Sequence, residues 1–196
     1  MDEETRLAIV ARAKAELRKR LRALRRTTPA AALAKRSERI VEQLVALDAI
    51  ANATRVALFW PIEERHEVDL RPLDAALRAR GAHVAYPCIG EHRTHMTFRF
   101  CAPDKLVMES LGFRGAPQDA LEAESLDAIV APAIALDASG NRLGYGAGFY
   151  DRALLRYPSS IKIGVAYDFQ LLAEVPVNAD DVAMNVVVTD ARVIRV

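Results

Sequence analysis

The chain has 196 residues, of which 52% are hydrophobic and 27% charged, and its net charge at pH 7 is only +1. This length and composition fit one globular domain and exclude a disordered chain. No apolar run reaches the roughly 18 residues needed to span a bilayer, and the acidic start is unlike a secretory leader. Two cysteines, Cys88 and Cys101, are too few for a disulfide scaffold or a zinc centre. We expect a cytoplasmic protein of one domain, residues 1–196.

Positive charge gathers at the start of the chain. Residues 1–40 hold twelve Lys and Arg against five Asp and Glu, whereas the remaining residues have a balance of −6. Such a basic segment can attract a phosphate-bearing ligand, an acidic lipid or a nucleic acid, or it can be a solvated helix face. It lacks the interleaved aromatic residues that stack on bases. We therefore expect neither a nucleic acid nor a membrane as partner.

The predicted elements begin with two helices. Residues 6–26 place apolar side chains at helical spacing from Leu7 to Leu24, with basic residues on the other face. Thr28 and Pro29 are predicted to be the N-cap and the first residue of a second helix that ends near residue 47. These segments predict a basic N-terminal helical pair.

Short apolar runs and helical segments then alternate. Pro61 and Pro87 are expected to end the strands before them, and Gly81 to end a helix. Residues 104–124, broken by glycine and proline, are expected to be mostly loop. The alternation predicts an α/β sandwich around a mostly parallel sheet, with ligands beyond the carboxyl ends of its strands. Strands are expected at 55–60, 83–86, 96–100 (an edge strand), 128–131, 161–166 and 186–189, and helices at 69–80 and 149–156.

The most informative segment covers residues 137–152 and carries three alternating glycines. Gly144, Gly146 and Gly148 follow a strand region and precede a predicted helix. Alternating glycines let backbone N–H groups turn inward, and a helix N-terminus adds further donors, so the segment could bind phosphate. It is neither a Walker loop nor a Rossmann fingerprint. The alternative is a glycine-rich turn, in which Asp151 caps the helix instead of binding Mg²⁺.

Residues 141–152, Asn-Arg-Leu-Gly-Tyr-Gly-Ala-Gly-Phe-Tyr-Asp-Arg, resemble the signature of the 5-formyltetrahydrofolate cyclo-ligase family. Lys14 and Arg18, four apart in the first helix, are similar to that family's N-terminal ATP-phosphate contact. The sequence Glu67-Val-Asp resembles its substrate-binding acidic loop. The resemblance continues in order through the segments Tyr86-Pro, Met96-x-Phe, Ile163-Gly-Val-Ala and Val175-Pro-Val, and reaches Asp181.

The resemblance implies one cyclo-ligase domain, a monomer or weak dimer, with ATP and Mg²⁺ as cofactors. Its substrate would be 5-formyltetrahydrofolate, with or without a polyglutamate tail, and its products 5,10-methenyltetrahydrofolate, ADP and phosphate. ATP would phosphorylate the formyl oxygen, N10 would attack the formyl carbon, and phosphate would leave.

The resemblance also implies roles for individual residues. Tyr150 would orient the formyl group, and Arg142 would stand near the transferred phosphoryl group, so these two would be catalytic. Asp151, joined by Asp181, would bind Mg²⁺. The expected folate ligands are Trp60, Glu67, Met96 and Tyr150, and the expected nucleotide ligands are Lys14, Arg18, Asn141, Arg142, Leu143, Gly144, Tyr145, Gly146, Ala147, Gly148 and Phe149.

Simpler interpretations of these residues stay open. Lys14 and Arg18 could form a solvated helix face, and Glu67 could belong to a surface loop. Trp60 and Met96 could be ordinary core residues.

Two departures from the family pattern concern substrate contacts. Asn185 stands where an aspartate is common, and Ala116-Pro117-Gln118 stands in place of a Glu-Pro pair.

The four histidines, His92 among them, form no helical pair with an acidic partner, so we expect no histidine metal site. For the whole chain the rival hypotheses are another ATP-using enzyme, a nucleic-acid-binding protein and a non-catalytic folate-binding regulator.

Overall fold

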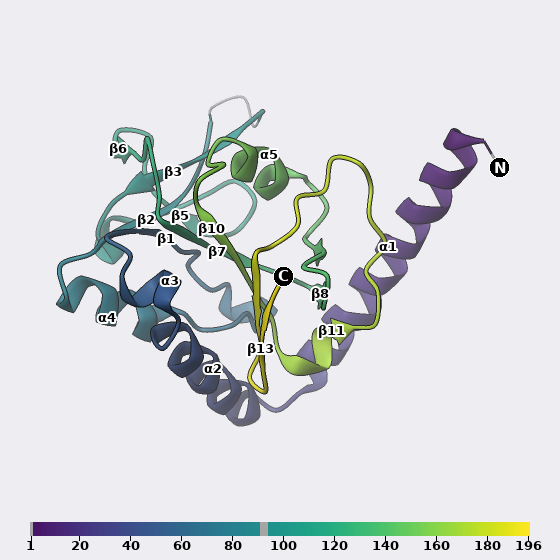
Figure 1. Cartoon of the computed structure of the whole chain (residues 1–196), viewed down its shortest axis with the longest axis horizontal. Coiled ribbons are helices and arrows are strands. Elements are labelled where there is room, and N and C mark those ends of the chain that lie inside the picture. Colours follow the sequence, from purple (N-terminus) through teal and green to yellow (C-terminus); the bar gives the residue numbers. More distant parts are fainter. Residues whose placement is uncertain (1, 91–93) are drawn as a thin grey trace.

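One large mixed sheet organises the molecule in the computed structural model, which describes residues 2–90 and 94–196 (Figure 1). The five central strands pair in parallel, and antiparallel strands extend both edges. The α/β class is confirmed, but the sheet is mixed at its edges. Within the described residues its order is β13 (Val193–Arg195), β12 (Val186–Val188), β10 (Ile161–Val165), β7 (Ala128–Pro132), β1 (Arg55–Ala57), β2 (His83–Ile89), β3 (Met96–Phe100) and β6 (Leu121–Glu122).

Both faces of this sheet are buried, because successive residues of a strand point to opposite sides. Val56 lies opposite Val84 in the parallel pair β1–β2, and both side chains join the core on one face. Ala57 and Ala85 are the next pair, and they join the core on the other face together with Ile129. The continuous apolar runs in the sequence therefore correspond to strands covered on both sides.

Helices cover the two faces in separate groups. Ile40, Leu44 and Leu73 pack in the first core, and Ala153 and Leu154 pack in the second. The sheet thus lies between two helical layers, as the sandwich prediction requires. The first layer holds α2 (Ala30–Val45), α3 (Asp48–Ala51) and α4 (Arg71–Ala79), and the second holds α5 (Phe149–Leu155).

The first helix, α1 (Glu3–Thr27), projects from the body rather than covering the sheet (Figure 1). Leu21 is buried against a small second sheet, but Leu7 and Leu24 are both 43% exposed. Lys14 and Arg25 are buried instead, so the predicted apolar stripe is wrong at both ends. The small sheet consists of β11 (Leu171–Leu172), β8 (Ala135–Asp137) and β9 (Arg142–Leu143).

Several predicted boundaries need correction. Thr28 ends α1, where its hydroxyl donates to the Leu24 carbonyl at 2.9 Å, and Pro29 takes the N-cap position of α2. The strand expected to reach Trp60 ends at Ala57. Pro87 lies inside β2, since the neighbouring strand β1 has already ended and requires no N–H there.

The segment 104–124 also contains more regular structure than predicted. It holds a short antiparallel pair and the edge strand β6. Within the described parts of the chain, no helix combines the length and the apolarity needed to cross a membrane. The remaining elements are η1 (Glu63–Arg65), η2 (Pro103–Lys105), β4 (Val107–Met108), β5 (Arg114–Gly115) and η3 (Asp168–Gln170).

Candidate functional site

A cavity of about 810 Å³ lies between α1, the connection from β1 to α4, and the glycine-bearing segment. Its volume is near the upper end of the roughly 300–1,000 Å³ found for small-molecule sites. Pro132, at the carboxyl end of β7, is part of its wall, so the cavity occupies the crevice predicted for an open α/β sheet. The expected site residues that line it are Lys14, Arg18, Trp60, Glu67, Met96, Arg142, Leu143, Gly144, Tyr145, Gly146, Ala147, Gly148, Phe149, Tyr150, Asp151 and Asp181.

The glycine-bearing segment begins as a hairpin, not as the predicted loop. Strands β8 and β9 pair antiparallel, and the buried Asp137 carboxylate closes the turn between them. It accepts from the N–H groups of Ser139 and Asn141 at 3.0 Å and from the Asn141 amide at 2.9 Å. Asn141 thus supports the turn and is not among the cavity-lining residues. A direct nucleotide contact from Asn141 stays a prediction.

Glycine is required at two positions after the hairpin. Gly146 has φ +105° and Gly148 has φ +68°, conformations that other residues adopt only with strain. Gly148 is the N-cap of α5, so Asp151 is not the cap of that helix. The Gly144 carbonyl accepts from the Arg18 Nε at 2.8 Å, which ties the glycine segment to α1.

A basic face of α1 forms one wall of the cavity. Lys14, Arg18, Arg22 and Arg25 are four, four and three residues apart, so they share one face of the helix. Lys14 is 6% exposed, which rules out a simple solvated face. Burial, assisted by repulsion from Arg22, lowers the pKa of Arg18. Arg22 and Arg25 are not among the residues expected from the sequence, although their spacing from Lys14 places them on the same helix face.

The two proposed metal ligands lie on adjacent segments. Asp151 Oδ1 accepts from Arg142 Nη2 at 3.0 Å and from the Val182 N–H at 3.4 Å. Asp181, which precedes Val182, forms an ion pair with Lys14. The chain between β11 and β12 is thereby held against both α1 and α5.

Asp151 and Asp181 supply too few donors to hold Mg²⁺ alone, so a bound ligand would have to supply further oxygen atoms. Among the described residues, which exclude His92, no group of three or more His, Cys, Asp or Glu side chains could hold a metal. Mg²⁺ usually takes one or two protein carboxylates and fills its other positions with water and phosphate oxygens. Asp151 Oδ2 has no hydrogen-bond partner within residues 2–90 and 94–196. The residues therefore fit a Mg²⁺ ion completed by a polyphosphate.

Two buried polar atoms beside Asp151 have no partner among the described residues. They are the Tyr150 hydroxyl and the Arg142 Nε. The Arg142 guanidinium lies 5.3 Å from the centre of the Tyr150 ring. Burial raises the pKa of Tyr150, so its hydroxyl stays protonated and can donate. Because buried polar groups are nearly always satisfied, these atoms mark a place where a ligand acceptor would bind.

Glu67 lines the cavity from the connection between β1 and α4. It is 8% exposed, so the surface-loop interpretation is wrong. Its Oε2 accepts from the Ile62 N–H at 2.9 Å, and its Oε1 accepts from the Tyr145 hydroxyl. Burial raises the pKa of Glu67, and the hydrogen bonds from Tyr145 and Ile62 oppose that rise.

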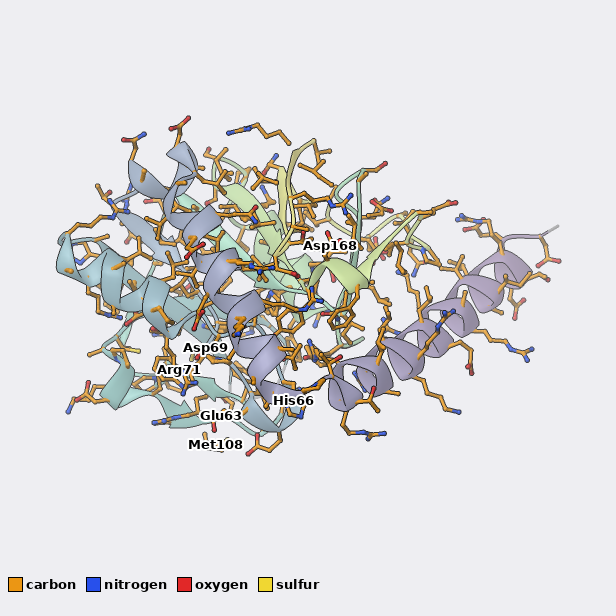
Figure 2. All side chains as sticks on the ribbon, turned by 90° about the horizontal axis from the view of Figure 1, so that it is seen from below. Glu63, His66, Asp69, Arg71, Met108 and Asp168 are labelled. Atoms are coloured by element: carbon orange, nitrogen blue, oxygen red, sulfur yellow. The ribbon has the colours of Figure 1, made fainter. Side chains whose placement is uncertain are left out.

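Charged side chains pair along the loop that carries Glu67. Arg71 Nη1 pairs with Glu63 at 2.8 Å, and its Nη2 pairs with Asp69 at 2.7 Å (Figure 2). His66, between them, has φ +50°, the one described non-glycine residue with positive φ. The loop therefore turns sharply just before Glu67, which directs the carboxylate inward.

Apolar side chains supply the walls next to Glu67. Met96 is 2% exposed, and Trp60 packs edge-on to Tyr86 with ring centres 6.1 Å apart. Both line the cavity while packing on the core, and a folate contact from either one stays a prediction. Further apolar wall residues that we had not predicted are Phe59, Ile89, Leu111 and Phe113.

At the two departures from the family pattern, the side chains form hydrogen bonds to backbone groups. Asn185 Oδ1 accepts from the Lys162 N–H at 2.8 Å, which joins β10 to the start of β12. Gln118 Nε2 donates to the Ile89 carbonyl. Neither side chain lines the cavity.

These features define an α/β protein with a basic wall and an apolar wall in one cavity. The model of the 5-formyltetrahydrofolate cyclo-ligase family matches residues 10–190. The chain therefore belongs to the 5-formyltetrahydrofolate cyclo-ligase family.

Individual relatives agree with this assignment. A 5-formyltetrahydrofolate cyclo-ligase of Escherichia coli is 30% identical over 158 residues, covering 72% of this chain and 87% of that protein. The corresponding protein of Mycolicibacterium smegmatis is 45% identical over 94 residues, and that match covers 46% of this chain and 48% of the relative. The solved structure of Aquifex aeolicus 5,10-methenyltetrahydrofolate synthetase has a TM-score of 0.81 at 31% identity, covering 93% and 92% of the two chains.

Proposed function

We propose that the chain cyclises 5-formyltetrahydrofolate to 5,10-methenyltetrahydrofolate with ATP and Mg²⁺, releasing ADP and phosphate. The observation that carries this proposal is the meeting of the basic face of α1, the glycine segment and the buried Glu67 in one cavity. The E. coli and A. aeolicus relatives are named for the two ends of that reaction. A cytoplasmic location, predicted from the low cysteine content, is part of the proposal.

The chemistry needs activation of a poor leaving group. Transfer of the γ-phosphoryl group to the formyl oxygen turns that oxygen into part of a phosphate. N10 then adds to the formyl carbon and loses its proton, and the electron pair of the carbon–oxygen bond leaves with the phosphate. The protein therefore has to hold two ligands in contact and neutralise the transferring phosphoryl group.

The nucleotide side would be served by cations and backbone. Lys14 and Arg18 would bind phosphates, and Arg142 would face the transferred phosphoryl group through its Nε, which has no partner among the described residues. Asp151, with Asp181 once Lys14 turns to phosphate, would hold Mg²⁺. When bound, Mg²⁺ supplies charge neutralisation for the phosphate oxygens.

The folate side would be served by directed hydrogen bonds and flat walls. The protonated Tyr150 hydroxyl would donate to the formyl oxygen and orient it. Glu67 would accept from the donor edge of the pterin. Trp60 and Met96 would enclose the ring between apolar surfaces.

The proposal is tested by following the near-ultraviolet absorbance of the conjugated methenyl product. The signal is expected only when 5-formyltetrahydrofolate, ATP and Mg²⁺ are all present. Asp151→Asn should lower the rate by at least about 10-fold, whereas Asp180→Asn, at an exposed neighbouring acid, should leave it unchanged. ATP binding without any methenyl product would refute the folate assignment and favour another ATP-using enzyme. Salt-sensitive nucleic-acid binding would favour the rival role of the basic segment.

A further inference from the structure

One side chain of the glycine segment reaches across the cavity. The Tyr145 hydroxyl donates to Glu67 Oε1 and accepts from Arg25 Nη2 at 2.7 Å. Two guanidinium groups lie over its ring, that of Arg22 at 5.1 Å and that of Arg65 at 5.0 Å from the ring centre. Anion binding by a glycine loop uses its backbone, so that role does not explain why a tyrosine is placed here.

The direction of this hydrogen-bond chain is fixed. Arginine can only donate, so the Tyr145 hydroxyl accepts from Arg25 and its single proton points to Glu67. Arg25 is 3% exposed and Glu67 is 8% exposed, so water competes little for either group. Each carboxylate oxygen can accept a second hydrogen bond. Tyr145 therefore orients Glu67 without blocking it from a further donor.

The backbone and the side chain of Tyr145 belong to different parts of the cavity. Its backbone stands between Gly144, whose carbonyl accepts from Arg18, and Gly146, which has φ +105°. These are the expected nucleotide contacts, while Glu67 is the expected folate contact. A nucleotide that orders the glycine segment would thus also fix the hydroxyl that holds Glu67.

We propose that Tyr145 is a positioning residue that couples the nucleotide site to the folate site. The inference rests on the proposed function and adds a thermodynamic link between the two ligands. Because such coupling is reciprocal, nucleotide should tighten folate binding by the same factor as folate tightens nucleotide binding, and coupling of this kind is typically about 5- to 150-fold. Removing the Tyr145 hydroxyl should bring this factor close to one.

The test is calorimetric titration of 5-formyltetrahydrofolate with and without the β,γ-imido analogue of ATP and Mg²⁺. Wild type should bind folate at least about fivefold more tightly with the analogue, and Tyr145→Phe should lose most of that gain. The control is Tyr157→Phe, because the buried Tyr157 hydroxyl donates a hydrogen bond to the Ala123 carbonyl, away from this cavity. If Tyr145 has only a structural role, Tyr145→Phe should lose stability as Tyr157→Phe does, and both variants should keep the coupling between nucleotide and folate.

A double-mutant cycle adds a second readout. If Tyr145 acts through Glu67, Tyr145→Phe should have little further effect on folate affinity in a Glu67→Gln background. Equal folate affinity with and without the analogue in wild type would overturn the coupling, and wild-type coupling in Tyr145→Phe would overturn the role of Tyr145. A wild type that binds the analogue but no folate would instead refute the proposed function, and the inference with it.

Discussion

Replacing Lys14 by methionine tests whether α1 is part of the nucleotide site. The Lys14 side chain is 8% exposed, and its partner Asp181 is 22% exposed. A hydrogen bond to a charged group contributes roughly 1.5–3 kcal/mol. Because Asp181 keeps some contact with water and a bond from the Asn178 N–H, we expect Lys14→Met to lower the free energy of unfolding by about 1–3 kcal/mol.

Lys14→Met should also weaken nucleotide binding. Losing one charge-assisted contact of the same size weakens binding by roughly 10- to 150-fold. The assay is calorimetric titration with the β,γ-imido analogue of ATP and Mg²⁺. It should be run at about 0.15 M salt, where charges farther apart than about 8 Å are largely screened.

Lys19→Met is the matched control, because Lys19 is exposed on the same helix and carries the same charge. It should change nucleotide affinity by less than about twofold at this salt concentration. Equal losses in the two variants would mean that the helix acts only through its net charge. Unchanged affinity in Lys14→Met would refute the assignment of α1 to the nucleotide site.

Three further predictions concern folding, measured by urea unfolding. Folding raises the pKa of Glu67 above its ordinary 4.5. The stability that this gives is therefore complete below pH 4.5 and is lost as the pH rises through the raised pKa. Glu67→Gln should remove this pH-dependent loss, which is about 1.4 kcal/mol for each unit by which the pKa is raised. Leu154→Ala, at a fully buried position, should cost about 2–5 kcal/mol. Gly140→Ala should cost at least about 2 kcal/mol, because φ is +81° and the new Cβ would lie 2.4 Å from a carbonyl oxygen.

Each of these has a contrary result. The same pH dependence in wild type and Glu67→Gln would contradict the raised pKa. Leu155→Ala, at a position 66% exposed, should cost under about 0.5 kcal/mol, and a loss equal to that of Leu154→Ala would contradict the packing of α5. Gly81→Ala, with φ +84° but open space around the Cβ, should cost only about 1–2 kcal/mol, and parity with Gly140→Ala would contradict the close approach.

Local constraints were predictable from the sequence. Alternating glycines between a strand and a helix predict a backbone that can turn freely, and Gly146 and Gly148 do have positive φ values. Gly81 follows the C-cap of α4 with φ +84°, as expected for a glycine just after a helix. The buried strands followed from apolar runs, because a strand covered on both faces leaves a continuous pattern. Such features depend on a few neighbouring residues, so the sequence alone could specify them.

Long-range contacts were not predictable in this way. Arg25 and Glu67 are charged, yet both are buried and both contact Tyr145, which is 78 residues from Glu67. The edge strands β6 and β13 are short, so their apolar alternation was too brief to detect. Charge burial and strand pairing depend on which distant segments meet, and local patterns do not contain that information.

The most direct test of the central claim follows the formyl oxygen. 5-Formyltetrahydrofolate carrying ¹⁸O in the formyl group would be converted with unlabelled ATP and Mg²⁺, and the released phosphate analysed by mass spectrometry. If the chain phosphorylates the formyl oxygen, one ¹⁸O atom should appear in each phosphate formed. Unlabelled phosphate, formed together with the methenyl product, would contradict the account.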